Sequence, residues 1–170
     1  GGSSFARGET FAHEWPPCKS IGCAKMQMQV GQFANGTLLV MGGAGKPLEH
    51  DTFAISTDGG VTFSSPHVDS RLPTSTESDL LVVSKEGGDA IFVSHDFCPG
   101  CSPLPDGNNR RNLTISASYN HGMTWHHVPL LPEDGKKDFS GGSCMADMSV
   151  GGYDSIAVGY ERGSERFDGE

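Results

Sequence analysis

Two adjacent arginines, Arg110 and Arg111, are the residues of this chain whose type and spacing most directly suggest binding chemistry. The planar guanidinium group pairs with a carboxylate through two parallel hydrogen bonds, so arginine suits the recognition of acidic ligands. Neighbouring side chains in a strand point to opposite faces, and one of the two arginines therefore turns inward. An inward arginine is costly without an acidic partner. We favour a salt bridge between Arg110 and Glu161, with binding of an anionic ligand as the alternative.

The five cysteines allow three kinds of chemistry. Cys98 and Cys101 have redox-type spacing, but they lie in a loop with Pro and Gly and not at a helix N-terminus that would lower a thiol pKa. Together with Cys18 and Cys23 they could form a zinc site, although the first spacing is wide. We favour disulfides among these four, and we predict that Cys144 is a small buried strand residue.

The histidines give a weaker indication of binding chemistry than the arginines and cysteines do. His126 and His127 are consecutive in a predicted strand, so they face opposite sides and cannot easily bind one metal ion. We expect both on the surface. His95 precedes Asp96 and could line a site, but we favour ordinary loop polarity. We expect no metal ion and no cofactor.

Composition narrows the class of protein. The 170 residues carry 12 Lys and Arg against 21 Asp and Glu, a net charge of −9 that disfavours nucleic acid and anionic membranes as partners. No apolar run approaches the roughly 20 residues of a membrane span. The 24 Gly and 10 Pro residues and the near absence of helical periodicity predict a turn-rich, all-β protein.

Several features favour a secretory, extracellular or organelle-lumenal location. The chain begins at Gly1 without a methionine, so we expect that an upstream segment has been removed. Asn35 and Asn112 each begin a glycosylation sequon, and the cysteines are compatible with an oxidising compartment. We expect Asn112 to lie in a strand, where a glycan would fit poorly.

One octapeptide pattern occurs twice, at residues 56–63 (STDGGVTF) and 118–125 (SYNHGMTW). Asp or Asn in a turn accepts hydrogen bonds from nearby backbone, Gly adopts an angle that other residues resist, and Ser closes the turn with its hydroxyl. The aromatic residue is expected to pack beneath the turn. The pattern therefore predicts two strand–turn–strand units built on Ser56, Asp58, Gly60, Thr62 and Phe63 and on Ser118, Asn120, Gly122, Thr124 and Trp125.

The sequence on either side of these two turns predicts four-stranded units built around them. We expect an N-terminal arm over residues 1–21, because two prolines follow Trp15, and then a segment over residues 22–170. Its units are expected at about residues 22–66, 78–130 and 141–163, the last of them incomplete. An incomplete unit leaves an open strand edge, so we expect packing against other protein chains or missing parts of the same fold.

The octapeptides resemble the Asp box of sialidases and related β-propellers, where it joins the two outer strands of a blade. The order of motifs over about residues 27–163 is also similar to the second half of a sialidase. The resemblance implies a partial propeller of about two complete blades plus part of a third. Blades of roughly 40 to 50 residues make this chain too short for a complete ring.

Sialidases are retaining glycosidases with a tyrosine nucleophile, a Glu partner and three arginines that hold the substrate carboxylate. By resemblance, Arg110 matches the third arginine and Glu161 matches the glutamate that orients the first. The nucleophile position falls on Met145, the Glu partner near Gln27 and the second arginine near Gly43. None of these three side chains can perform the corresponding step.

The resemblance therefore implies an inactive sialidase-like module, serving as a structural or recognition subunit of a larger assembly. Two alternatives stay open. The chain could be half of an active exo-sialidase that upstream blades complete, or a propeller that binds acidic glycans through Arg110.

Overall fold

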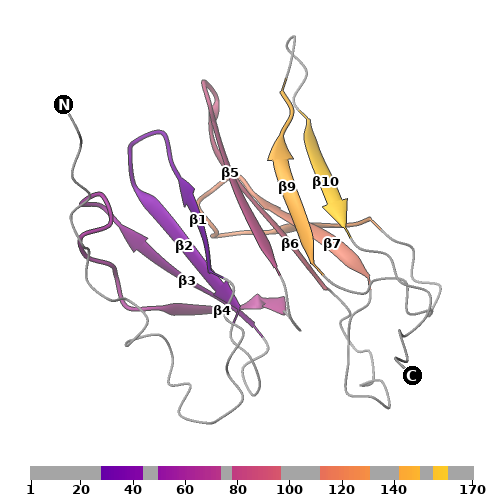
Figure 1. Ribbon diagram of the computed structural model, residues 1–170, viewed down its shortest axis with the longest axis horizontal. Helices are drawn as coiled ribbons and strands as arrows, with labels where there is room; N and C mark the ends of the chain where they lie inside the picture. Colours follow the sequence, from indigo (N-terminus) through magenta and orange to yellow (C-terminus); the bar gives the residue numbers. More distant parts are fainter. Residues whose placement is uncertain are drawn as a thin grey trace, which may run out of the picture.

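The computed structural model describes residues 28–43, 50–73, 78–96, 112–130, 142–149 and 155–160, and these form ten β-strands in three antiparallel sheets (Figure 1). No residue in these ranges is helical, which confirms the all-β prediction. No helix in the described ranges is long and apolar enough to cross a membrane.

The first two sheets repeat one plan. The first sheet has the order β1 (Met28–Gln32), β2 (Leu38–Gly43), β3 (His50–Ser56) and β4 (His67–Pro73). The second has the order β5 (Asp79–Lys85), β6 (Gly88–Asp96), β7 (Leu113–Ser118) and β8 (His126–Pro129). In both sheets each strand pairs with the next one along the chain, as the expected four-stranded units require.

The third sheet pairs β9 (Ser143–Asp147) with β10 (Ile156–Tyr160), and in the described part of the chain it has these two strands alone. The three sheets lie one beside the next in Figure 1. Their first strands are neighbours, because β1 lies against β5 and β5 lies against β9. The sheets are thus stacked in chain order through their first strands.

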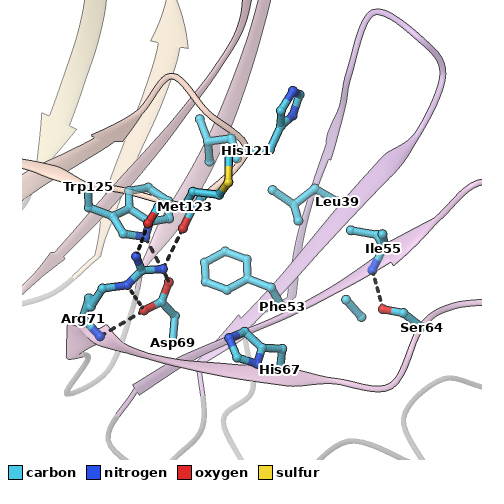
Figure 2. A pocket seen from close by; sticks show the side chains of 13 residues that line it. Leu39, Phe53, Ile55, Ser64, His67, Asp69, Arg71, His121, Met123 and Trp125 are labelled. Atoms are coloured by element: carbon cyan, nitrogen blue, oxygen red, sulfur yellow. Dashed lines mark hydrogen bonds and ion pairs between the residues drawn. The ribbon is translucent and has the colours of Figure 1, made fainter.

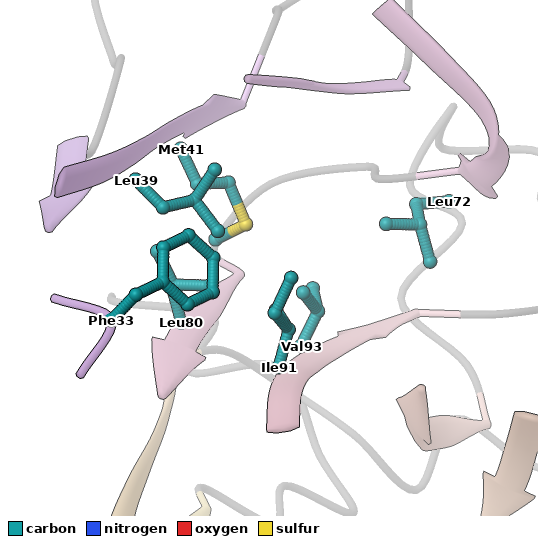
Figure 3. Packing of buried hydrophobic residues seen from close by; sticks show 7 residues of the cluster. All are labelled: Phe33, Leu39, Met41, Leu72, Leu80, Ile91 and Val93. Carbon is teal, nitrogen blue, oxygen red and sulfur yellow. The ribbon is translucent and has the colours of Figure 1, made fainter. Parts of the chain in front are cut away.

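An apolar core fills the space between the first and second sheets (Figure 3). Alternation along the strands places Leu39 and Met41 on one side of it and Ile91 and Val93 on the other, all nearly inaccessible to water. The close approach of the sheets depends on Gly31, where an added Cβ would lie 2.3 Å from Cγ2 of Val82. We call this packed contact the first joint.

Several local expectations need correction. From the octapeptides we expect the Thr and the aromatic residue to start the next strand, but the strands begin later, at His67 and at His126. The Thr residues are instead hydrogen-bonded within the turns. Asn112 precedes β7 and adopts a left-handed φ of 54°, so it does not lie in the strand. Cys144 is exposed and not buried, because alternation along β9 turns it away from the side on which Ser143 contacts the second sheet.

Candidate functional site

The first turn, residues 56–63, joins β3 to β4 and is held by Asp58. Its carboxylate accepts the backbone N–H of Thr62 at 2.9 Å and the Thr62 hydroxyl at 2.6 Å. The Ser56 hydroxyl donates to Asp58 at 2.8 Å and accepts the N–H of Gly60 at 2.8 Å. The hydrogen bonds from Thr62, together with the one from Ser56, lower the pKa of Asp58 to about 2. The predicted roles of Ser56, Asp58 and Gly60, whose φ is 90°, are confirmed.

The second turn, residues 118–125, joins β7 to β8 with the same geometry. The N–H of Thr124 donates to Oδ1 of Asn120 at 2.9 Å, and the N–H of Gly122 donates to the Ser118 hydroxyl at 2.8 Å. One hydrogen bond has its donor and acceptor exchanged relative to the first turn. The Asn120 amide donates to the Thr124 hydroxyl at 2.8 Å, whereas in the first turn the Thr hydroxyl donates to the Asp carboxylate. The two turns also use a left-handed residue that the sequence pattern did not predict, Gly59 in the first and His121 in the second.

The two aromatic residues pack differently. Phe63 lies against Val40 and Ala54 on the side of the first sheet that faces away from the core. Trp125 packs against the core between the sheets, with its ring stacked 6.3 Å from that of Phe53. The second turn therefore contributes to the first joint, and the first turn does not.

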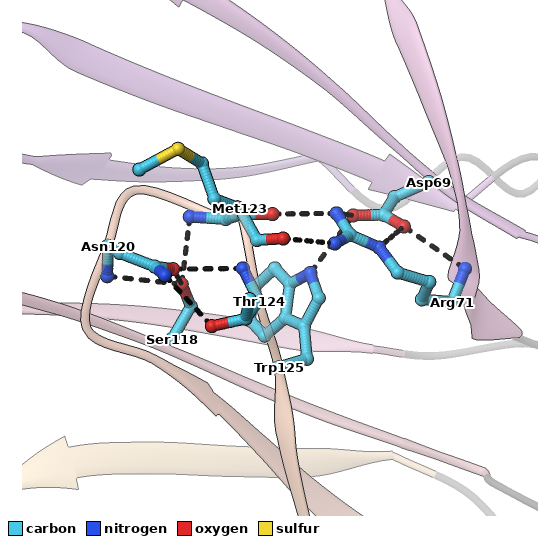
Figure 4. Close-up of polar contacts among 8 residues, drawn as sticks. Asp69, Arg71, Ser118, Asn120, Met123, Thr124 and Trp125 are labelled. Carbon is cyan, nitrogen blue, oxygen red and sulfur yellow. Dashed lines mark hydrogen bonds and ion pairs between the residues drawn. The ribbon is translucent and has the colours of Figure 1, made fainter.

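A polar network fastens the second turn to β4 (Figure 4). Arg71 donates to both carboxylate oxygens of Asp69, at 2.8 and 2.6 Å, and to the carbonyls of Gly122 and Met123, at 2.6 and 2.5 Å. Trp125 Nε1 donates to Asp69 at 2.9 Å. Burial alone would raise the pKa of Asp69, but the hydrogen bonds from Arg71 and Trp125 outweigh it and lower the pKa. Sequence reasoning missed this network, although an Asp and an Arg two residues apart share one face of a strand.

A cavity of about 350 Å³ lies beside this network, between the first sheet and the second turn (Figure 2). Most of its wall is apolar or aromatic, with Phe53, Trp125 and Met123 prominent. Asp69 and Arg71 line it as a paired carboxylate and guanidinium, and the Arg71 guanidinium donates hydrogen bonds to four oxygen atoms of the protein. This arrangement holds β4 and the second turn together.

Three side chains on the core-facing side of the second sheet form a second network. The buried Ser116 hydroxyl lies 2.6 Å from Nε2 of His95 and 2.7 Å from Nδ1 of His127. His95 is 1% exposed in β6, so its assignment to loop polarity was wrong. His126 and His127 are both exposed, as expected. Burial, with the nearby charges of His126 and Arg71, lowers the pKa of His127.

The contact between the second and third sheets, which we call the second joint, includes polar contacts. The Met145 N–H donates to the Asp79 carboxylate at 2.5 Å, and the hydroxyls of Ser94 and Ser143 lie 2.7 Å apart. Burial raises the pKa of Asp79, and the hydrogen bonds from the N–H groups of Met145 and Leu80 oppose that effect only in part. Sequence reasoning did not single out Asp79, because its role depends on a strand 66 residues away.

The predicted site residues are only partly within the described ranges. Met145 lies half-buried in β9, Gly43 ends β2, and Asn35 lies in the turn between β1 and β2. The other predicted residues lie outside the described residues: Gln27, Arg110, Arg111, Glu161, Cys18, Cys23, Cys98 and Cys101. Within the described ranges, no group of three or more His, Cys, Asp or Glu side chains is arranged to hold a metal ion.

No family model matches the chain, and no curated protein is significantly similar to it.

Proposed function

We propose that this chain is a sialidase-like β-propeller module without glycosidase activity, which acts as a structural or recognition subunit of a larger assembly. The observation that carries the proposal is the repeated unit. Two successive four-stranded antiparallel sheets have the same strand order, and the same turn joins the third strand to the fourth in each. Stacking through β1, β5 and β9 is the arrangement expected of blades around a common axis.

The absence of activity is inferred from the position that resembles the nucleophile. Met145 has a thioether side chain, which cannot form the glycosyl–enzyme intermediate of a retaining glycosidase. Its N–H is bonded to Asp79, which fastens β9 to the second sheet. The residues on the described strands thus support a role in joining sheets.

A fluorogenic sialoside assay on the purified full-length chain tests this proposal. We expect no release of sialic acid above the buffer rate, for the wild type and for Met145→Ala and Arg110→Ala alike. Release that disappears in either variant would overturn the proposal in favour of an active exo-sialidase. Retention of the chain on a sialylated glycan column, lost on Arg110→Ala, would instead favour the glycan-binding alternative.

A further inference from the structure

The two ends of the stack of sheets present two different faces. At one end, the side of the third sheet that faces away from the second sheet carries Cys144 and Ala146 on β9 and, directly opposite, Gly159 and Ala157 on β10. All four are exposed, and none is charged. Their cross-strand pairs make a face of small residues, which we call the small face.

At the other end, β1 presents larger apolar side chains. Val30 is 61% exposed and Met28 is 40% exposed. Both point away from the core of the first joint, because Val30 pairs with Val40, whereas the adjacent Gly31 faces Val82 in the second sheet. We call Met28 and Val30 the projecting face.

The first joint shows how these sheets pack when a neighbour is present. There, Gly31 on β1 removes a side chain so that the branched Val82 on β5 can approach the backbone. In this joint, close packing thus combines a small residue on β1 with a branched residue on β5. The small face and the projecting face offer the same combination, and they lie at opposite ends of one chain.

We propose that the projecting face of one copy of this chain packs on the small face of a second copy. β1 of the first copy then continues the row of first strands beyond β9 of the second copy. This inference rests on the proposed propeller-like stack of sheets, and the partner is a second copy of the same chain. The contact is head-to-tail, because two different faces meet, and such contacts produce closed rings or open chains depending on the rotation per copy.

Neither face carries a charge that would have to lose its water when the two meet, which favours association of apolar surfaces. The described polar groups of β9 are used instead on the opposite side, toward the second sheet, where Ser143 contacts Ser94 and the Met145 N–H contacts Asp79. The third sheet therefore has one side fastened within its own chain and one side suited to a neighbour.

Light scattering after size exclusion of the full chain tests the proposal with charge-introducing variants. Val30→Glu blocks only the projecting face, and Ala157→Arg blocks only the small face. We expect the wild type to be oligomeric at ~100 μM and each variant alone to have the mass of one chain. An equimolar mixture is expected to give a particle of roughly twice that mass, because each variant retains the face that the other lacks.

Val61→Glu, at a 54% exposed position in the first turn, is the matched control and should keep the wild-type mass. A monomeric wild type, variants that remain assembled, or a mixture that stays monomeric would each overturn the proposal. Met28→Glu and Ala146→Arg repeat the test if circular dichroism shows that a first variant does not fold. The mass is independent of sialoside hydrolysis, so failure of this inference and failure of the proposed function can be told apart.

Discussion

Asp58 and Asn120 occupy the same place in their turns, but only Asp58 carries a charge that acid can remove. The folded state lowers its pKa from 3.8 to about 2. A carboxylate with a lowered pKa stabilises the fold above its unfolded pKa, and this contribution is lost as the pH falls through the folded value. The first turn should therefore weaken between about pH 4 and pH 2, and the second turn should not.

Asp58→Asn should make the thermal midpoint of unfolding less dependent on pH between about pH 4 and pH 2. It should also lower that midpoint at neutral pH. Asn120→Asp is the reciprocal variant and should add acid sensitivity. Thermal unfolding followed by circular dichroism at a series of pH values measures both. Equal pH dependence in the wild type and Asp58→Asn would show that this carboxylate does not stabilise the turn.

Asp79 shows the opposite behaviour, because burial raises its pKa. Ionisation of such a group lowers the stability of the folded state. The stabilising contribution of the protonated group is therefore complete below the unfolded pKa and is lost as the pH rises through the folded pKa. Asp79→Asn keeps an oxygen for the Met145 N–H and removes the charge. We expect it to be at least as stable as the wild type at pH 7, with the difference opening above about pH 4.

Asp79→Ala is the control for that prediction, since it leaves the Met145 N–H without its acceptor and should cost about 1 kcal/mol. Urea unfolding at pH 4 and pH 7 compares the three proteins. A lower stability of Asp79→Asn than of Asp79→Ala at pH 7 would contradict this account of the second joint.

At the scale of elements, the first joint depends on the contact between Gly31 and Val82. Gly31→Ala would place a Cβ 2.3 Å from Val82 Cγ2, and overpacking of this kind costs about 1–3 kcal/mol. Gly87→Ala is the matched control, because nothing lies within 4 Å of its added Cβ. The double variant Gly31→Ala with Val82→Ala should recover part of the loss in urea unfolding. Additive losses would mean that the two strands are not in close contact.

Arg71 fastens the second turn to β4, and its loss should loosen that contact. Because its side chain is 45% exposed while Asp69 is 7% exposed, we expect Arg71→Ala to cost about 1–2 kcal/mol, mostly through the carboxylate left behind. Arg71→Lys should recover little, since an ammonium group cannot pair with both carboxylate oxygens and two carbonyls. Urea unfolding followed by tryptophan fluorescence measures both. Full recovery in Arg71→Lys would show that charge alone matters there.

Elements with local signals were predicted well, and contacts between distant elements were not. The two octapeptides predicted the turns between the third and fourth strands of the first two sheets, although β4 lies beyond the unit expected at about residues 22–66. The pairings of Asp69 with Trp125 and of Asp79 with Met145 join residues more than fifty positions apart, so no local pattern reveals them. His95 was misassigned for the same reason, since its burial depends on neighbouring strands.

At the scale of the whole molecule, the stack of three sheets leaves apolar surface at both ends of the described strands. Val30 at one end and the paired Ala146 and Ala157 at the other are exposed on sheet faces. Faces of this kind are usually covered by a neighbour. This exposed apolar surface is the physical basis for proposing that the chain is a subunit of an assembly.

The mass and composition of the native particle that contains this chain, determined by light scattering and mass spectrometry of every component, test the central proposal most directly. We predict a particle with more than one protein chain and no hydrolysis of a sialoside. A particle with the mass of a single copy of this chain that releases sialic acid would contradict the proposal.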